Sequence, residues 1–182
     1  MQCLSEEERK AVLALARQAL TEAICGGRLL APFPSEGIFS ARCGVFVTLH
    51  VRGKLRGCIG VIDGREPLGE SIVRCTASAA LQDPRFTQMQ PEEVTDSEIE
   101  VSLLSPIQRI LPEQIEVGKH GLVVEQGMRR GLLLPQVAVE HRLDRERFLE
   151  ETCHKAGLAR DAWKNPETAI YGFTCEIVRP EN

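Results

Sequence analysis

The residue pattern with the clearest chemical content is the hexapeptide Leu55–Gly60 (LRGCIG), which holds one cysteine between two glycines. Side chains alternate along a strand, so Arg56 and Cys58 are expected on one face. A guanidinium close to a thiol favours the thiolate, which is the nucleophilic form of cysteine. Strand interiors avoid glycine, so Gly57 and Gly60 predict a bulge or a close approach to the backbone. The pattern fits a reactive thiol with room for a substrate, and it also fits a bulge around a small buried residue.

Two histidines are candidate general bases for such a thiol, because imidazole titrates near neutral pH. His120 lies in a Lys-His-Gly turn that enters a predicted strand, and His154 follows Cys153 on a predicted helix. We prefer His120 to His154 as the base. The structural alternatives are a turn histidine that bonds the local backbone for His120, and a surface helix residue for His154.

Asp83 and Arg85, in a DPRF segment, carry charges that with Arg56 would hold an anionic or carbonyl-bearing small molecule. The alternative that we favour for this segment is structural. An aspartate before proline accepts turn hydrogen bonds, and an arginine can join two chain segments. Gln136, which follows a proline, fits either a ligand-binding wall residue or a helix cap.

The elements that must position these residues follow from hydrophobic spacing and turn residues. In the first half of the chain the patterns predict a helix over 5–25, a hairpin of strands 44–51 and 55–62, a helix over 67–81, a helical turn over 91–94 and a strand over 99–104. Ser5 and Glu8 form a capping-box pattern at the start of the first helix. The second helix ends before Pro84, because the residue before a proline leaves helical space.

The second half of the chain shows the same mixture of hairpins and helices. The patterns predict a hairpin of strands 122–126 and 132–134, a short helix over 137–141, a helix over 144–156 capped by Asp144, and a closing strand over 169–178. Strands that arrive as hairpins, without regular β-α-β units, favour an α+β fold with antiparallel pairing.

Composition narrows the class of protein. A chain of 182 residues that is 43% hydrophobic fits one globular domain, with or without a minor lobe. A net charge of −4 and an aromatic content of 4% argue against nucleic-acid binding. The seven cysteines are widely spaced, and the N-terminus lacks an apolar signal core, so we expect a reduced, cytoplasmic protein. Neither a membrane span nor a metal site is expected, because no apolar run is long enough and no histidine pair has ligand spacing.

Five blocks in order carry a resemblance to a known family. They are Leu55–Gly60 (LRGCIG), Asp83–Phe86 (DPRF), Gly118–Leu122 (GKHGL), Gly131–Val137 (GLLLPQV), and Lys155–Leu158 (KAGL) followed by Trp163. Over residues 5–178 the chain resembles the Ammecr domain family, also called AmmeMemoRadiSam system protein A.

The resemblance implies a two-lobed α+β fold within one domain over residues 1–182. The larger lobe would hold a mainly antiparallel sheet with flanking helices, and a smaller β-containing lobe would leave a cleft beside it. The resemblance does not supply a known reaction, and the cofactor is unknown. The family name implies a shared pathway with Memo-like and radical SAM proteins, which are the candidate partners.

The leading hypothesis is a cytoplasmic, cysteine-centred enzyme or small-molecule-binding domain. Cys58 would be the nucleophile, His120 or His154 the base, and Arg56 and Arg85 the residues that hold the ligand. The alternative is a non-catalytic adaptor that grips a partner protein, in which the LRGCIG motif is architectural. Nucleic-acid binding is the third and least supported hypothesis.

Overall fold

The structure, a computed structural model, describes residues 4–26 and 34–180 and divides into two compact units. The first unit comprises residues 1–104 and 176–182, and the second comprises residues 105–175. The chain returns to the first unit inside strand β7 (Ala169–Val178), which therefore contributes residues to both.

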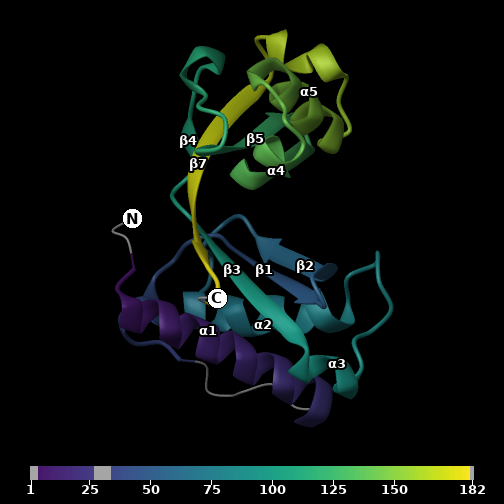
Figure 1. The fold of residues 1–182 in the computed structure, drawn as a ribbon. Coiled ribbons are helices and arrows are strands. Elements are labelled where there is room, and N and C mark those ends of the chain that lie inside the picture. The colour runs from purple at the N-terminus through teal and green to yellow at the C-terminus, as the bar shows by residue number, and fades with distance from the viewer. Residues whose placement is uncertain (1–3, 27–33, 181–182) are drawn as a thin grey trace. The chain divides into compact units, whose positions relative to one another are not determined.

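The first unit is a small antiparallel sheet backed by helices (Figure 1). Its elements are α1 (Glu6–Thr21), the π-helical turn η1 (Glu22–Gly26), the 3-10 turn η2 (Gly37–Ser40), β1 (Val45–Val51), β2 (Lys54–Val61), α2 (Leu68–Leu81), α3 (Pro91–Thr95) and β3 (Ser97–Leu104). The capping box is present: the Glu8 N–H donates to Ser5 Oγ at 3.2 Å, and the Ser5 N–H donates to the Glu8 carboxylate at 2.8 Å. The predicted first helix is thus correct in position, but its last turn widens into η1.

The sheet of the first unit has the strand order β2-β1-β3. One of its faces is apolar and is covered by α1 and α2 (Figure 1). The residues of β1 and β3 on this face are all buried: Val45, Val47, Leu49, Ile99, Val101 and Leu103. Because side chains alternate, the intervening residues of each strand project to the opposite face. We call it the polar face, because Thr48, His50, Glu98 and Glu100 lie on it, although Phe46 lies there too.

The β1–β2 pairing contains one irregularity. Leu49 lies opposite Gly57, whereas His50 lies opposite Leu55, so Arg56 has no partner on β1. An extra residue on one strand of an antiparallel pair is a β-bulge. The bulge that the glycines of this strand predict is therefore present, and Arg56 is the bulged residue.

The second unit also has an antiparallel sheet and flanking helices (Figure 1). Its elements are β4 (Gln108–Arg109), the 3-10 turn η3 (Pro112–Gln114), β5 (His120–Gln126), β6 (Arg129–Leu133), α4 (Pro135–Glu140), α5 (Arg145–Lys155), the 3-10 turn η4 (Arg160–Lys164) and most of β7. The Asp144 carboxylate caps α5 by accepting the Arg147 N–H at 2.8 Å. Phe148, Leu149 and Leu122 form the centre of the main core cluster.

The predicted α+β class with a mainly antiparallel sheet and flanking helices is confirmed. Strand β4 was not predicted from the sequence; it is only two residues long and pairs with β7. Among the described residues, no helix is both long and apolar enough to cross a lipid bilayer.

Candidate functional site

The polar face of the first unit carries the Cys58 thiol in a defined row of side chains. Thr48 lies opposite Cys58 on β2 and opposite Glu100 on β3, so these three residues cross the sheet together. The Thr48 hydroxyl donates a hydrogen bond to the Cys58 sulfur at 3.3 Å. Cys58 is half-buried, and its thiol belongs to this polar face because the neighbours Gly57 and Ile59 face the helices.

The peptide groups of Cys58 are held from the outer edge of β2. Its N–H donates to Asp83 Oδ2 at 2.9 Å, and its carbonyl accepts from Arg85 Nη2 at 3.3 Å. Both groups therefore point away from β1, which makes Cys58 and Thr48 a non-hydrogen-bonded pair. Side chains of such pairs approach more closely, and this explains the contact between the hydroxyl and the thiol.

Asp83 is a buried carboxylate with every acceptor position in use. It is 4% exposed and accepts hydrogen bonds from the Arg85 side chain, from Nε at 2.9 Å and from Nη2 at 2.7 Å. The Arg85 peptide N–H adds a third bond at 3.1 Å. The hydrogen bonds from the Arg85 side chain, then those from the two peptide N–H groups, hold the pKa of Asp83 far below its ordinary value despite burial.

Arg85 is the cation that lies beside the cysteine. Its side chain is 54% exposed and extends over the Phe86 ring, 5.4 Å from the centroid. The pKa of Arg85 is raised, mainly by the Asp83 carboxylate, and the nearby Cys58 side chain contributes to the same shift. The Nη1 group makes no hydrogen bond to any described residue, so it has donors left for a ligand.

Arg56 does not serve the thiol in the way that strand alternation predicts. Its guanidinium binds the Glu93 carboxylate through Nε at 2.7 Å and Nη2 at 3.1 Å, and it also donates to the carbonyls of Thr87 and Gln88. The same contact lowers the pKa of Glu93. These contacts fasten β2 to the segment that leads into α3 and to α3 itself.

The space that a side chain would take at Gly57 and at Gly60 is filled by other protein atoms. A Cβ atom on Gly57 would lie 2.1 Å from the Ala79 carbonyl oxygen of α2, and a Cβ on Gly60 would lie 2.3 Å from the Phe46 ring. The expected close approach at these glycines is real, but the approaching groups are a helix backbone and an aromatic ring.

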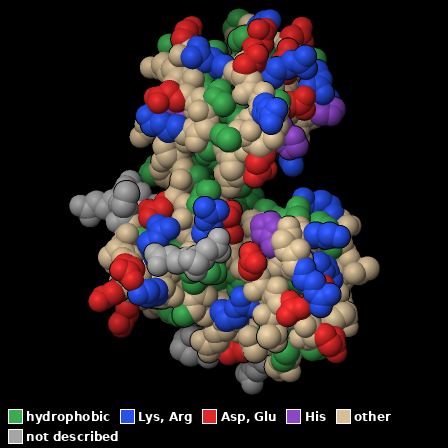
Figure 2. Space-filling view, in the orientation of Figure 1, with side chains coloured by type: hydrophobic (Ala, Val, Ile, Leu, Met, Phe, Trp, Pro, Cys, Tyr) green, Lys and Arg blue, Asp and Glu red, His purple; other side chains and the backbone are tan. Residues whose placement is uncertain are grey.

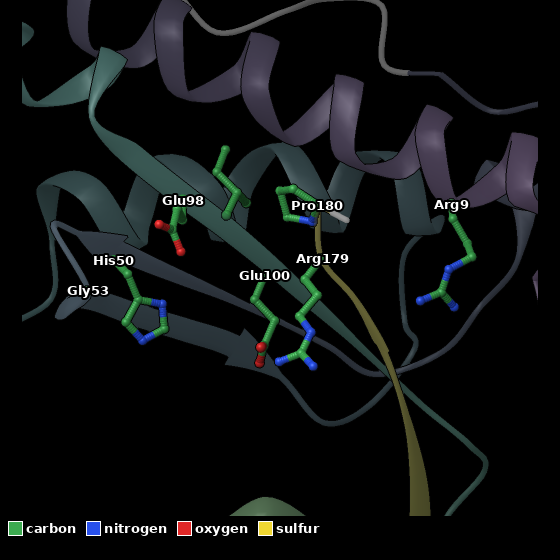
Figure 3. Close-up of a pocket in the computed structure, with 8 residues that line it drawn as sticks. Arg9, His50, Gly53, Glu98, Glu100, Arg179 and Pro180 are labelled. Atoms are coloured by element: carbon green, nitrogen blue, oxygen red, sulfur yellow. The ribbon is translucent and has the colours of Figure 1, made fainter. Parts of the chain in front are cut away.

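A groove of about 780 Å³ opens beside this face, and Figure 3 shows the side chains that line it. They come from α1, β1, the β1–β2 turn, β3 and the segment after β7: Arg9, His50, Gly53, Glu98, Ile99, Glu100, Arg179 and Pro180. His50 is the histidine of the first unit, and it shares the polar face with Thr48. His50 is not among the predicted site residues, although alternation from Thr48 along β1 predicts this placement.

The other three predicted residues belong to the second unit. His120 accepts the Glu116 N–H on Nδ1 at 3.0 Å, which is the local backbone bond named as its alternative. His154 is exposed and lines a cavity with His141. Gln136 lies in the first turn of α4, and its Oε1 is buried without a hydrogen-bond partner among the described residues. That either His120 or His154 acts as a base for Cys58 stays a prediction.

The part of the chain that the structure describes contains no group of three or more His, Cys, Asp or Glu residues able to hold a metal ion. The first unit thus offers a thiol that has a hydroxyl donor and a guanidinium beside it. The backbone of this cysteine is held at both its N–H and its carbonyl.

Comparisons with known proteins agree on one family. The family model described as AMMECR1 matches residues 13–178. A protein of Methanothermobacter thermautotrophicus is 43% identical over 96% of this chain and 95% of its own length, and one of Aquifex aeolicus is 43% identical over 90% and 88%. The crystal structure of an uncharacterized protein from Pyrococcus horikoshii superposes with a TM-score of 0.89 at 39% identity, covering 96% of this chain and 92% of that one.

Proposed function

The chain belongs to the AMMECR1 family, and on that premise we propose that its first unit uses the Cys58 thiol to engage a small anionic or carbonyl-bearing molecule. One observation supports this most directly. The Cys58 peptide is held at both its N–H and its carbonyl, while its half-buried thiol lies on the polar face beside Thr48 and Arg85. Fixing the backbone of a nucleophile in this way preorganises it for attack.

The neighbouring groups suit the chemistry of a thiolate that adds to a carbonyl carbon. A hydroxyl donor 3.3 Å from the sulfur and a guanidinium bonded to the same residue's carbonyl are neighbours of the kind that favour thiolate chemistry. After addition, the negative charge moves to the former carbonyl oxygen, and the free Nη1 donors of Arg85 would stabilise it there. His50, on the same face of the same unit, is a candidate base for the thiol proton.

The rate of alkylation at Cys58 tests this proposal. Iodoacetamide and iodoacetate are applied to the intact protein at pH 7, and modification of each cysteine is followed by mass spectrometry, with exposed Cys25 as internal reference. We expect Cys58 to react faster than free cysteine and to favour iodoacetate, the anionic reagent, more than Cys25 does. Arg85→Lys should keep part of this preference and Arg85→Met should lose it. A rate at or below that of free cysteine would exclude a nucleophilic role.

A non-catalytic adaptor is the second candidate, and a specific observation favours it. Arg56, Gly57, Gly60 and Asp83 all make contacts that hold the fold, which is what an architectural motif would do. In that case the protein grips a Memo-like or radical SAM partner, as the family name suggests. Pull-down of such a partner that Cys58→Ser leaves intact would support the adaptor role, whereas loss of binding in that variant would assign the contact to the thiol.

A further inference from the structure

The second unit contains a cavity of about 460 Å³ that is separate from Cys58 in the chain and in the fold. Its lining residues come from β6, α4 and α5 and from the turn between the helices: Leu133, Val137, His141, Leu143, Glu151, His154 and Lys155. A volume of this size is typical of small-molecule sites, which are lined mainly by apolar side chains with a few polar groups.

The apolar wall of this cavity is supported by the core behind it. Leu133 and Leu143 are half-buried and pack against the cluster that contains Phe148. Val137 comes from the middle of α4 and completes the wall. Because these side chains rest on a packed core, the wall keeps its shape without a ligand.

The rim of the same cavity carries the positive charge of Lys155 beside the imidazole groups of His141 and His154. His141, His154 and Lys155 are exposed, and their side chains form no hydrogen bond or ion pair with any described residue. Glu151, the acidic member of the lining, is bound by Arg160, which lowers the pKa of Glu151. Figure 2 shows histidine and Lys or Arg side chains gathered at the edge of the second unit, over α4 and α5.

We propose that this cavity, which we call the α4–α5 cavity, binds a small anionic amphiphile, a carboxylate with a short apolar body. The apolar part would lie on Leu133, Val137 and Leu143, where its removal from water drives binding. The carboxylate would lie at the rim, where Lys155 and the two histidines offer unpaired donors. An amine of the same length lacks the charge that the rim selects.

Amide chemical shifts of the ¹⁵N-labelled full chain, titrated with sodium octanoate, test this site. We expect saturable shifts confined to residues near 133–143 and 151–155. Butanoate should bind at least about ten-fold more weakly, because it has four fewer methylene groups to bury. Octylamine, with the same chain and opposite charge, should give no saturable shifts at these residues.

Two variants distinguish binding by the rim residues from a general effect of positive charge on the protein. The double change His154→Gln with Lys155→Gln should weaken octanoate binding by about five-fold or more, since the charge-assisted contact of Lys155 and the imidazole donor of His154 are both removed. Lys119→Gln, an exposed lysine of the same unit outside the cavity, should leave the affinity unchanged. Equal binding of octanoate and octylamine, shifts centred elsewhere, or equal affinity in the double variant and Lys119→Gln would overturn the proposal. None of these outcomes depends on the reactivity of Cys58.

Discussion

The buried carboxylate of Asp83 accepts the peptide N–H of Cys58 at 2.9 Å, across 25 residues of sequence. This bond joins the DPRF segment to the LRGCIG strand and covers the open edge of β2 at the cysteine. Edge strands that are left bare invite pairing with other chains, so Asp83 and Arg85 both close the edge and fix the residue that we propose to be reactive.

Replacement of Asp83 by asparagine should destabilise the fold strongly. The amide loses the charge that pairs with Arg85 and presents an N–H group toward that guanidinium. Because the buried carboxylate accepts four hydrogen bonds and an amide cannot accept all of them, we expect a loss of about 1–3 kcal/mol in the free energy of unfolding at pH 7. Urea denaturation measures it, and Asp96→Asn, at an exposed ion pair with Arg52, should change stability by about 0.5 kcal/mol or less.

The contribution of Asp83 should depend on pH in one direction. Its pKa in the folded protein lies far below the value of about 3.9 in an unfolded chain. The stabilisation is therefore complete above about pH 5 and is lost as the pH falls through the unfolded and then the folded pKa. The difference in stability between the wild type and Asp83→Asn should shrink below about pH 4. A difference that stays constant down to pH 2 would contradict this assignment.

Gly57→Ala should lower the free energy of unfolding, whereas Gly26→Ala should not. The added methyl group would lie 2.1 Å from the Ala79 carbonyl oxygen, so strand β2 and helix α2 would have to move apart. We expect a loss of about 2–3 kcal/mol, measured by chemical denaturation. Gly26→Ala is the matched control, because its nearest contact is 3.8 Å away, and it should cause no loss. Equal losses of stability in the two variants would contradict the packing role of Gly57.

Local patterns in the sequence predicted local structure well. The Ser5–Glu8 capping box and the helix that Asp144 caps are present, and β7 has the predicted bounds. Each depends on contacts within a few residues or on a simple alternation of buried positions. The β1–β2 hairpin is also present, within one residue at each predicted strand end.

The orientation of Arg56 could not be predicted in the same way. Strand alternation places it beside Cys58, but Arg56 is the bulged residue and its guanidinium binds Glu93. Whether a strand bulges at one residue or another depends on packing against α2, which is distant in sequence. The same holds for Arg85, whose place beside Cys58 depends on the turn after α2. His50, by contrast, could have been found by alternation from Thr48.

The Arg56–Glu93 pair should show measurable coupling. Both side chains are mostly buried, at 15% and 27% exposed, and the contact uses two hydrogen bonds. In a double-mutant cycle with Arg56→Met and Glu93→Gln we expect an interaction energy of about 1–2 kcal/mol. The Arg52–Asp96 pair of the same unit, at 82% and 46% exposed, should give about 0.5 kcal/mol or less. A coupling for Arg56 no larger than this would leave the arginine available to a ligand.

Alanine changes at two cysteines would separate the reactive role of Cys58 from an architectural one. Cys75 on α2 is 4% exposed, and burial raises its pKa to about 11, so it should stay unmodified by alkylating reagents at neutral pH. Cys75→Ala should cost about 1–2 kcal/mol through lost packing, whereas half-buried Cys58→Ala should cost about 1 kcal/mol or less. Unfolding free energies of the two variants give the comparison. A nucleophile on the polar face should be dispensable for folding, so a larger loss at Cys58 than at Cys75 would mean that the thiol is part of the packing and would count against a nucleophilic role.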